Sequence, residues 1–138
     1  MILLDTSFLY ALNDANDRNH ERTVRFLRVV NDSLYLPASV LPELCYLLHS
    51  RLGHHVMRRF LSGLATSNLQ IVEGFRADMN RIAELLEQYA DAQLDYTDAL
   101  IITLAERLSI TRIATYDRRD FTVVRPRHCS HFDLLPEG

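Results

Sequence analysis

The chain has no lysine, since all fifteen of its basic residues are arginine. A Walker A loop needs a lysine at the nucleotide phosphates, and receiver domains also use one, so both classes are poorly supported. Glycine is scarce, with four in the chain, and neither a GxGxxG nor a GxSxG motif is present. Dinucleotide binding by a Rossmann fold and catalysis by an α/β-hydrolase are therefore also poorly supported.

Cysteines and long apolar runs are few. Two cysteines, Cys45 and Cys129, do not make a disulfide scaffold. No apolar stretch approaches the ~20 residues that a membrane-spanning helix needs. The first residues form a strand-like run without the basic segment, apolar segment and cleavage site of a signal peptide. We therefore expect a cytoplasmic protein with no membrane partner.

The composition is typical of one globular domain, which we expect to span residues 1–138. A hydrophobic share of 48% is ample for a packed core. The formal net charge of −3 argues mildly against nucleic-acid binding, because nucleic-acid binders are often basic. This objection weakens if several acids hold cations, because bound metals change the local charge.

Expected strands alternate with expected helices along the chain. The strands are Ile2–Asp5, Leu34–Leu36, Leu69–Val72 and Arg112–Thr115, with a candidate fifth in the tail at Val123-Val124 or Phe132-Leu134-Leu135. The helices are Ser7–Asn13, His20–Val30, one capped by Ser39 and running to about Arg51, His54–Thr66, Phe75–Asp91 and Tyr96–Leu108. This alternation predicts a three-layer α/β/α sandwich with a mostly parallel sheet of four to five strands.

Acidic residues stand at the ends of several expected elements. Asp5 follows the first strand, Glu43 lies in a helix-opening turn, Asp98 lies at a helix start, and Asp117 follows the fourth strand. Open α/β sheets bind ligands beyond the carboxyl ends of their strands, so these carboxylates should converge there. Mg²⁺ and Mn²⁺ prefer oxygen ligands and can activate water for phosphodiester hydrolysis. The pattern therefore predicts metal-dependent hydrolysis.

Each of these four acids also has a simpler explanation. Asp5 could cap the following helix. Glu43 could be a first-turn acid favoured by the helix dipole, although its apolar neighbours lead us to expect partial burial. Asp95 and Asp98 match a capping box, and both interpretations hold together if Asp95 caps the helix while Asp98 binds metal.

The segment after the fourth strand leaves alternatives open. Asp117 could be an ordinary turn residue, and Asp120, three residues on, is a rival for its role. Arg118 and Arg119 lie between these acids, and arginine suits bidentate phosphate contacts. A merely solvated basic surface would explain the two arginines equally well.

Four segments carry a family resemblance. They are Ile2-Leu3-Leu4-Asp5-Thr6-Ser7, Leu36-Pro37 before the Glu43 helix, Leu94-Asp95-Tyr96-Thr97-Asp98-Ala99 with Leu104-Ala105-Glu106, and Ile113-Ala114-Thr115-Tyr116-Asp117-Arg118-Arg119-Asp120-Phe121. The third and fourth segments together are fairly specific. Across essentially the whole chain, the sequence resembles a PIN domain, the fold of metal-dependent ribonucleases. The match is closest to the VapC-type toxins of bacterial type II toxin–antitoxin pairs.

The resemblance implies a site, a cofactor and partners. The site would be Asp5, Glu43, Asp98 and Asp117, with Thr6, Thr115 and Asp120 in support. The cofactor would be Mg²⁺ or Mn²⁺, the reaction endonucleolytic cleavage of RNA, and Arg118 and Arg119 weaker candidates for RNA phosphate. The family also implies a homodimer and a small antitoxin, for which an apolar stripe on Arg51–Thr66 is a candidate groove.

Two other function classes stay open. Haloacid-dehalogenase-like phosphatases, which represent Asp-based phosphotransfer, also place an aspartate after the first strand. They resemble DxDxT, whereas the second position after Asp5 is Ser7 here. The other class is a non-catalytic RNA-binding or scaffold domain with a degenerate acidic pocket. Metal binding together with turnover distinguishes a nuclease from that second class.

Overall fold

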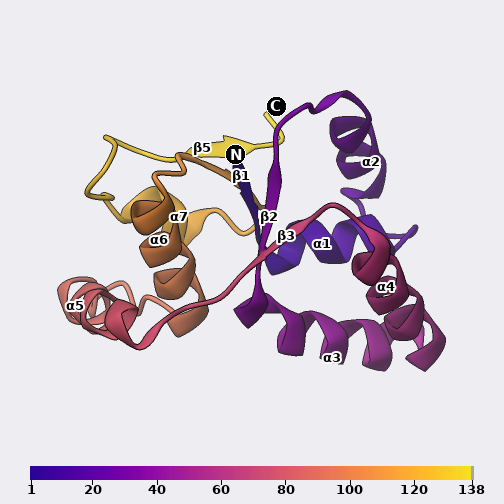
Figure 1. The fold of residues 1–138 in the computed structure, drawn as a ribbon, viewed down its shortest axis with the longest axis horizontal. Coiled ribbons are helices and arrows are strands. Elements are labelled where there is room, and N and C mark those ends of the chain that lie inside the picture. Colours follow the sequence, from indigo (N-terminus) through magenta and orange to yellow (C-terminus); the bar gives the residue numbers. More distant parts are fainter. Residues whose placement is uncertain (138) are drawn as a thin grey trace.

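Five short parallel strands form the centre of the protein, as seen in a computed structural model that describes residues 1–137 (Figure 1). The strands are β1 (Ile2–Leu4), β2 (Leu34–Pro37), β3 (Gln70–Val72), β4 (Arg112–Ala114) and β5 (Asp133–Leu135). Their order across the sheet is β3-β2-β1-β4-β5. Leu3 of β1 lies opposite Tyr35 of β2 on one side and Ile113 of β4 on the other. The expected parallel sheet is confirmed.

Helices cover both faces of this sheet. One group, which lies on one side in Figure 1, contains α1 (Thr6–Asn13), α2 (His20–Val29), α3 (Leu41–Leu52) and α4 (His54–Thr66). The other contains α5 (Met79–Gln88), α6 (Tyr96–Leu108) and α7 (Arg119–Val123). The predicted three-layer α/β/α sandwich is therefore confirmed. Among residues 1–137, no helix has both the length and the apolar character needed to cross a bilayer.

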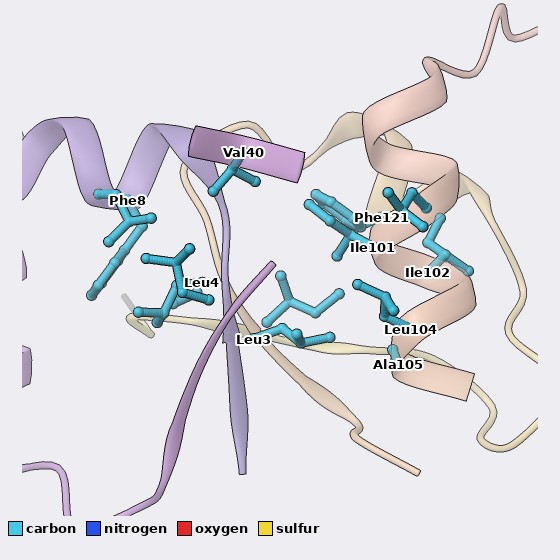
Figure 2. Packing of buried hydrophobic residues seen from close by; sticks show 14 of the residues in the cluster. Leu3, Leu4, Phe8, Val40, Ile101, Ile102, Leu104, Ala105 and Phe121 are labelled. Carbon is cyan, nitrogen blue, oxygen red and sulfur yellow. The ribbon is translucent and has the colours of Figure 1, made fainter. Parts of the chain in front are cut away.

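The core is built around β1, whose side chains are fully buried. Successive residues of a strand point to opposite faces of the sheet. In Figure 2, Leu4 lies on the same side as Phe8 of α1, whereas Leu3 lies toward Leu104 of α6. Burying each such side chain contributes roughly 1.5–3 kcal/mol to stability. The residue after β1, Asp5, is consequently held at the carboxyl edge of the sheet.

The start of α3 differs from the prediction. Ser39 does not cap this helix, because Ala38–Val40 form a 3₁₀ turn first. The hydroxyl of Ser39 is instead buried without a hydrogen-bond partner. The helix begins at Leu41 with Pro42 in its first turn, where proline costs no hydrogen bond.

The expected helix over Phe75–Asp91 is split. It consists of a 3₁₀ turn at Arg76–Asp78, in which the Phe75 amide donates to Asp78 at 2.7 Å, followed by α5, which ends at Gln88.

The segment before the tail also differs from the prediction. Val123 was a candidate strand residue, but it ends the short helix α7, which the sequence pattern did not reveal. β-branched residues such as Thr122 and Val123 usually favour strands. The buried Phe121 packs edge-to-face against Phe132 and anchors the helix. The fifth strand comes from Asp133–Leu135, the other candidate.

The end of α6 provides a test of this architecture. Exposed Ser109 adopts a left-handed conformation (φ 57°, ψ 39°), which costs an L-residue about 1–2 kcal/mol and costs glycine little. We expect Ser109→Gly to raise the free energy of unfolding by roughly 0.5–1 kcal/mol in urea titrations, after the entropy cost of glycine is deducted. Ser62→Gly, at an exposed site inside α4, should lower it by roughly 0.5 kcal/mol. Shifts of the same sign in both variants would contradict this interpretation.

Candidate metal centre

A polar pocket of about 530 Å³ opens at the carboxyl edge of β1 and β4. All four acids of the predicted site line it, together with the rival Asp120. The complete set of acidic lining residues is Asp5, Asp17, Glu43, Asp95, Asp98, Asp117 and Asp120. The convergence expected from the ends of the secondary-structure elements therefore occurs.

Asp5 occupies the N-cap position of α1, but its side chain makes no capping hydrogen bond. Its Oδ2 atom instead accepts a 2.8 Å hydrogen bond from the hydroxyl of Thr115. Burial raises the pKa of Asp5 to about 6, against the lowering effect of that hydrogen bond. The nearby carboxylates of Asp117 and Glu43 add to the rise. Helix capping therefore does not explain this aspartate.

The hydroxyl groups of Ser7 and Thr115 connect the start of α1 to the end of β4, and that of Thr115 also holds Asp5. A hydroxyl has one proton to donate. When Thr115 donates it to Asp5, its oxygen can accept the 3.1 Å hydrogen bond from the Asp117 amide. Ser7 lies 3.1 Å from the same oxygen and accepts from the Tyr116 amide at 2.9 Å. The chain after β4 is thus fixed to the start of α1, and Asp117 stays beside Asp5.

The start of α6 carries the second fixed carboxylate. Asp95 caps the helix and accepts a 2.6 Å hydrogen bond from the Thr97 amide. Half-buried Asp98 lies against the carboxyl group of Asp120. Burial first, and then this acidic neighbour, raise the pKa of Asp98 strongly. Asp95 therefore caps the helix, as one part of the prediction stated, and metal binding by Asp98 stays a prediction.

Asp120 and Asp117 differ in burial. Asp120 lies in the first turn of α7 and is buried, whereas Asp117 is exposed at the pocket rim. The Asp120 Oδ1 atom lies 3.0 Å from the guanidinium of Arg119, but it accepts no well-aligned hydrogen bond. Asp120 also contacts Asp98, so it belongs to the buried part of the site. The sequence had indicated only a supporting role for it.

Glu43 lines the pocket from the first turn of α3 but is exposed, so the expectation of partial burial was wrong. Its neighbour Leu44 and Leu48, one turn on, are fully buried. Successive helical residues lie about 100° apart around the axis, so Glu43 is turned from the core toward solvent. It nevertheless stays near enough to Asp5 to raise the pKa of that carboxyl group.

The two arginines after Asp117 have different surroundings. Arg119 lines the pocket. The guanidinium of Arg118 donates to the backbone carbonyls of Thr115 at 2.9 Å and Pro136 at 2.6 Å. That Arg118 and Arg119 bind RNA phosphate stays a prediction. Arg119 is the better placed of the two, because it lines the pocket.

Two lining residues, Tyr10 and Arg51, were not expected from the sequence. The guanidinium carbon of Arg51 lies 5.2 Å from the centre of the Tyr10 ring. The Tyr10 hydroxyl donates to Asp14 at 2.8 Å. Only the packing of α1 against α3 brings the two side chains together, so no local sequence signal could have revealed the pair.

The donor set fits a hard divalent cation. No three acidic, histidine or cysteine side chains within residues 1–137 form a preformed cage. The fit rests instead on carboxylates crowded at one pocket and on two buried oxygens without hydrogen-bond partners, Thr6 Oγ1 and Asp120 Oδ1. Mg²⁺ characteristically takes one or two carboxylates and keeps several waters. A cation here would also offset the repulsion between Asp98 and Asp120.

Known proteins share this architecture. Residues of this chain superpose on the Mycobacterium tuberculosis toxin VapC20, described as cleaving the sarcin–ricin loop, with a TM-score of 0.80 and 20% identity over 87% of this chain and 92% of that one. A toxin–antitoxin complex from Klebsiella pneumoniae gives a TM-score of 0.68 and 19% identity, covering 90% and 92% of the two chains.

In sequence, the chain is 29% identical over 135 residues to the ribonuclease VapC26 of Mycobacterium tuberculosis, covering 98% of this chain and 100% of that protein. The family model described as PIN domain matches residues 2–125. That match spans the sheet from β1 to β4 and every acidic residue of the pocket. The chain therefore belongs to the PIN domain family.

Proposed function

We propose that this protein is a metal-dependent endoribonuclease. The observation that carries the proposal is the convergence of Asp5, Asp98 and Asp120 from three separate elements on one pocket of a PIN domain. A relative that matches nearly the whole chain is named a ribonuclease, which supports the same reaction class. A purely structural set of acids would be expected to pair with arginine, but Asp5 and Asp98 have no ion-pair partner among residues 1–137.

Asp5 and Asp98 would hold Mg²⁺ or Mn²⁺, with Asp120, Asp117 and Glu43 completing the set. When bound, such a cation supplies Lewis-acid stabilisation of the phosphate and lowers the pKa of attacking water. The Thr115 hydroxyl keeps Oδ2 of Asp5 in one orientation. Arg119 lines the same pocket and would contact a phosphate oxygen of the RNA.

We further propose that the protein is the toxin of a toxin–antitoxin pair and forms a homodimer. The Klebsiella pneumoniae complex supports an antitoxin partner. The candidate groove on Arg51–Thr66 offers less apolar surface than its sequence suggested. Val56 is buried, and Phe60 and Leu64 pack against the core, which leaves Leu61 as the exposed member of the stripe.

Cleavage of a mixed RNA pool tests the activity directly. With Mg²⁺ or Mn²⁺ present, we expect purified protein free of co-purified partner to give discrete fragments, and EDTA to abolish them. Asp5→Asn should lower the rate at least about 100-fold, because it removes a negative metal ligand. Asp91→Asn, at an exposed site outside the pocket, is the matched control and should cleave normally. Equal rates for these two variants would contradict the assignment.

The raised pKa of Asp98 predicts the pH dependence of stability without metal. Below about pH 4, the carboxyl group of Asp98 is protonated in both the folded and the unfolded states, so it does not lower the free energy of unfolding. Stability should fall as pH rises above that value toward the raised folded-state pKa, because folding then opposes ionisation. Near neutral pH, Asp98→Asn should therefore stabilise the metal-free protein by roughly 1 kcal/mol, or a few degrees in melting temperature.

Added Mg²⁺ should raise the melting temperature of the wild type but not that of Asp98→Asn. Thermal melts in EDTA and in Mg²⁺, with Asp91→Asn as control, check both effects. A metal-free Asp98→Asn protein that melts below the wild type would show that the carboxylate is not under electrostatic stress.

Parallel melts separate Asp117 from Asp120. Because Asp120 is buried against Asp98 and Asp117 is exposed, Asp120→Asn should remove most of the Mg²⁺-dependent stabilisation. Asp117→Asn should retain most of it. The reverse order would support the sequence-based prediction that Asp117 is the metal ligand and Asp120 its support.

A further inference from the structure

The acidic pocket needs positive charge beside it if it is to receive RNA. Seven acids line it, against two arginines, Arg51 and Arg119. Several arginines elsewhere are already neutralised by a carboxylate: Arg81, Arg107, Arg112 and Arg127. Within the pocket, Arg119 pairs with Asp120. Phosphate contacts beyond that of Arg119 would come from arginines that have no acid partner and are oriented by an aromatic ring.

Arg51 is the first such residue. Its guanidinium carbon lies 5.2 Å from the centre of the Tyr10 ring, at cation–π distance. In the described part of the chain it has no carboxylate at ion-pair distance. Tyr10 is itself held, since it is buried and donates to Asp14. Contact with this ring therefore holds the cation at the pocket.

Arg22, on α2, repeats this arrangement. Its guanidinium carbon lies 5.3 Å from the centre of the Tyr116 ring, which lines the pocket. The Tyr116 hydroxyl lies 2.6 Å from the hydroxyl of Thr23. One N–H of Arg22 donates to the Pro136 carbonyl at 2.9 Å, and no acid among residues 1–137 pairs with it. Arg22 is therefore fixed but keeps its charge.

The two arginine–tyrosine pairs lie on opposite sides of α1. Phe8 stacks on Tyr116, with ring centres 6.1 Å apart, and contacts Phe26 of α2 edge-to-face. Tyr10, two residues further along the helix, points about 200° away from Phe8 around the axis. It meets Arg51 from α3 on the other side. Asp5, the residue before α1, lines the same pocket as Tyr116 of one pair and as Tyr10 and Arg51 of the other.

We propose that Arg22 and Arg51 bind backbone phosphates of the RNA on the two sides of the scissile bond, each oriented by its tyrosine. This assignment rests on the proposed nuclease function. Arginine N–H groups match phosphate oxygens in pairs, and neither guanidinium has a carboxylate partner that would compete with a phosphate. A substrate that makes both contacts must extend on both sides of the cleaved bond. The two arginines would therefore favour cleavage at internal bonds of an RNA chain over cleavage at its ends.

Salt-dependent binding tests the proposal. The probe is a short fluorescein-labelled single-stranded RNA of randomised sequence, measured by anisotropy in EDTA so that nothing is cleaved. Each phosphate contact on a single strand contributes about 0.7 to the slope of log K against log salt. Arg22→Ala and Arg51→Ala should each reduce the slope by about 0.7, and the double variant by about 1.4.

Matched controls are Arg25→Ala on α2 and Arg59→Ala on α4, both exposed and outside the pocket. They should leave the slope nearly unchanged. Tyr116→Leu keeps every charge but removes the ring beneath Arg22, so it should weaken binding, and Tyr116→Phe should restore it. Thermal melts establish that each variant is folded.

Control variants that lower the slope as much as Arg22→Ala and Arg51→Ala would overturn the proposal, as would a wild type that binds no RNA. RNA cleavage with unchanged slopes would overturn the arginine assignment and leave the nuclease standing. RNA binding that depends on Arg22 and Arg51, without metal-dependent cleavage, would support the arginine assignment and contradict the nuclease. The protein would then be an RNA-binding module.

Discussion

Burial of β1 between two parallel neighbours is the constraint on which the site depends. Its three residues are at most 2% exposed, and the Asp5 amide that follows donates to the Ala114 carbonyl at 3.0 Å. A shift of one residue would move Leu3 and Leu4 to the wrong faces, so the register is strongly specified. Asp5 is therefore placed by hydrophobic packing, and Thr115, next to Ala114 on the adjacent strand, is placed with it.

The same packing brings like charges together. Asp98 reaches the pocket from α6, a helix whose residues Ala99 to Ala105 are all buried, so it cannot move away from Asp120 without disturbing the core. The raised pKa values of Asp5 and Asp98 mean that the ionised site opposes folding near neutral pH. Stabilisation comes from elsewhere, including the nearly buried pair of Arg81 and Glu106. Functional sites commonly carry such local cost on a stable scaffold.

The sequence predicted those features of the fold and the site that depend on the local pattern of apolar residues. The apolar stripe of α6 and the burial of β1 are strong periodic signals, and they place Asp98 and Asp5 correctly at the ends of their elements. The exposure of Glu43 was missed because it depends on which face of α3 packs inward. The burial of Asp120 was missed because it depends on α7, a helix too short and too rich in β-branched residues to show a helical pattern.

Contacts between elements that lie far apart in the sequence were beyond local pattern altogether. Arg51 and Tyr10 meet because α1 packs on α3, and Arg22 and Tyr116 are separated by most of the chain.

These two pairs use a property of arginine that lysine lacks. A guanidinium can stack its flat face on a tyrosine while its edge donates hydrogen bonds, whereas a lysine ammonium has no such division of surfaces. Beside a pocket lined by seven acids, a mobile cation could turn inward to pair with a carboxylate. In the proposed nuclease, contact with a ring that is itself hydrogen-bonded would hold each arginine in place, so that the acids would remain available to a metal and the arginines to RNA.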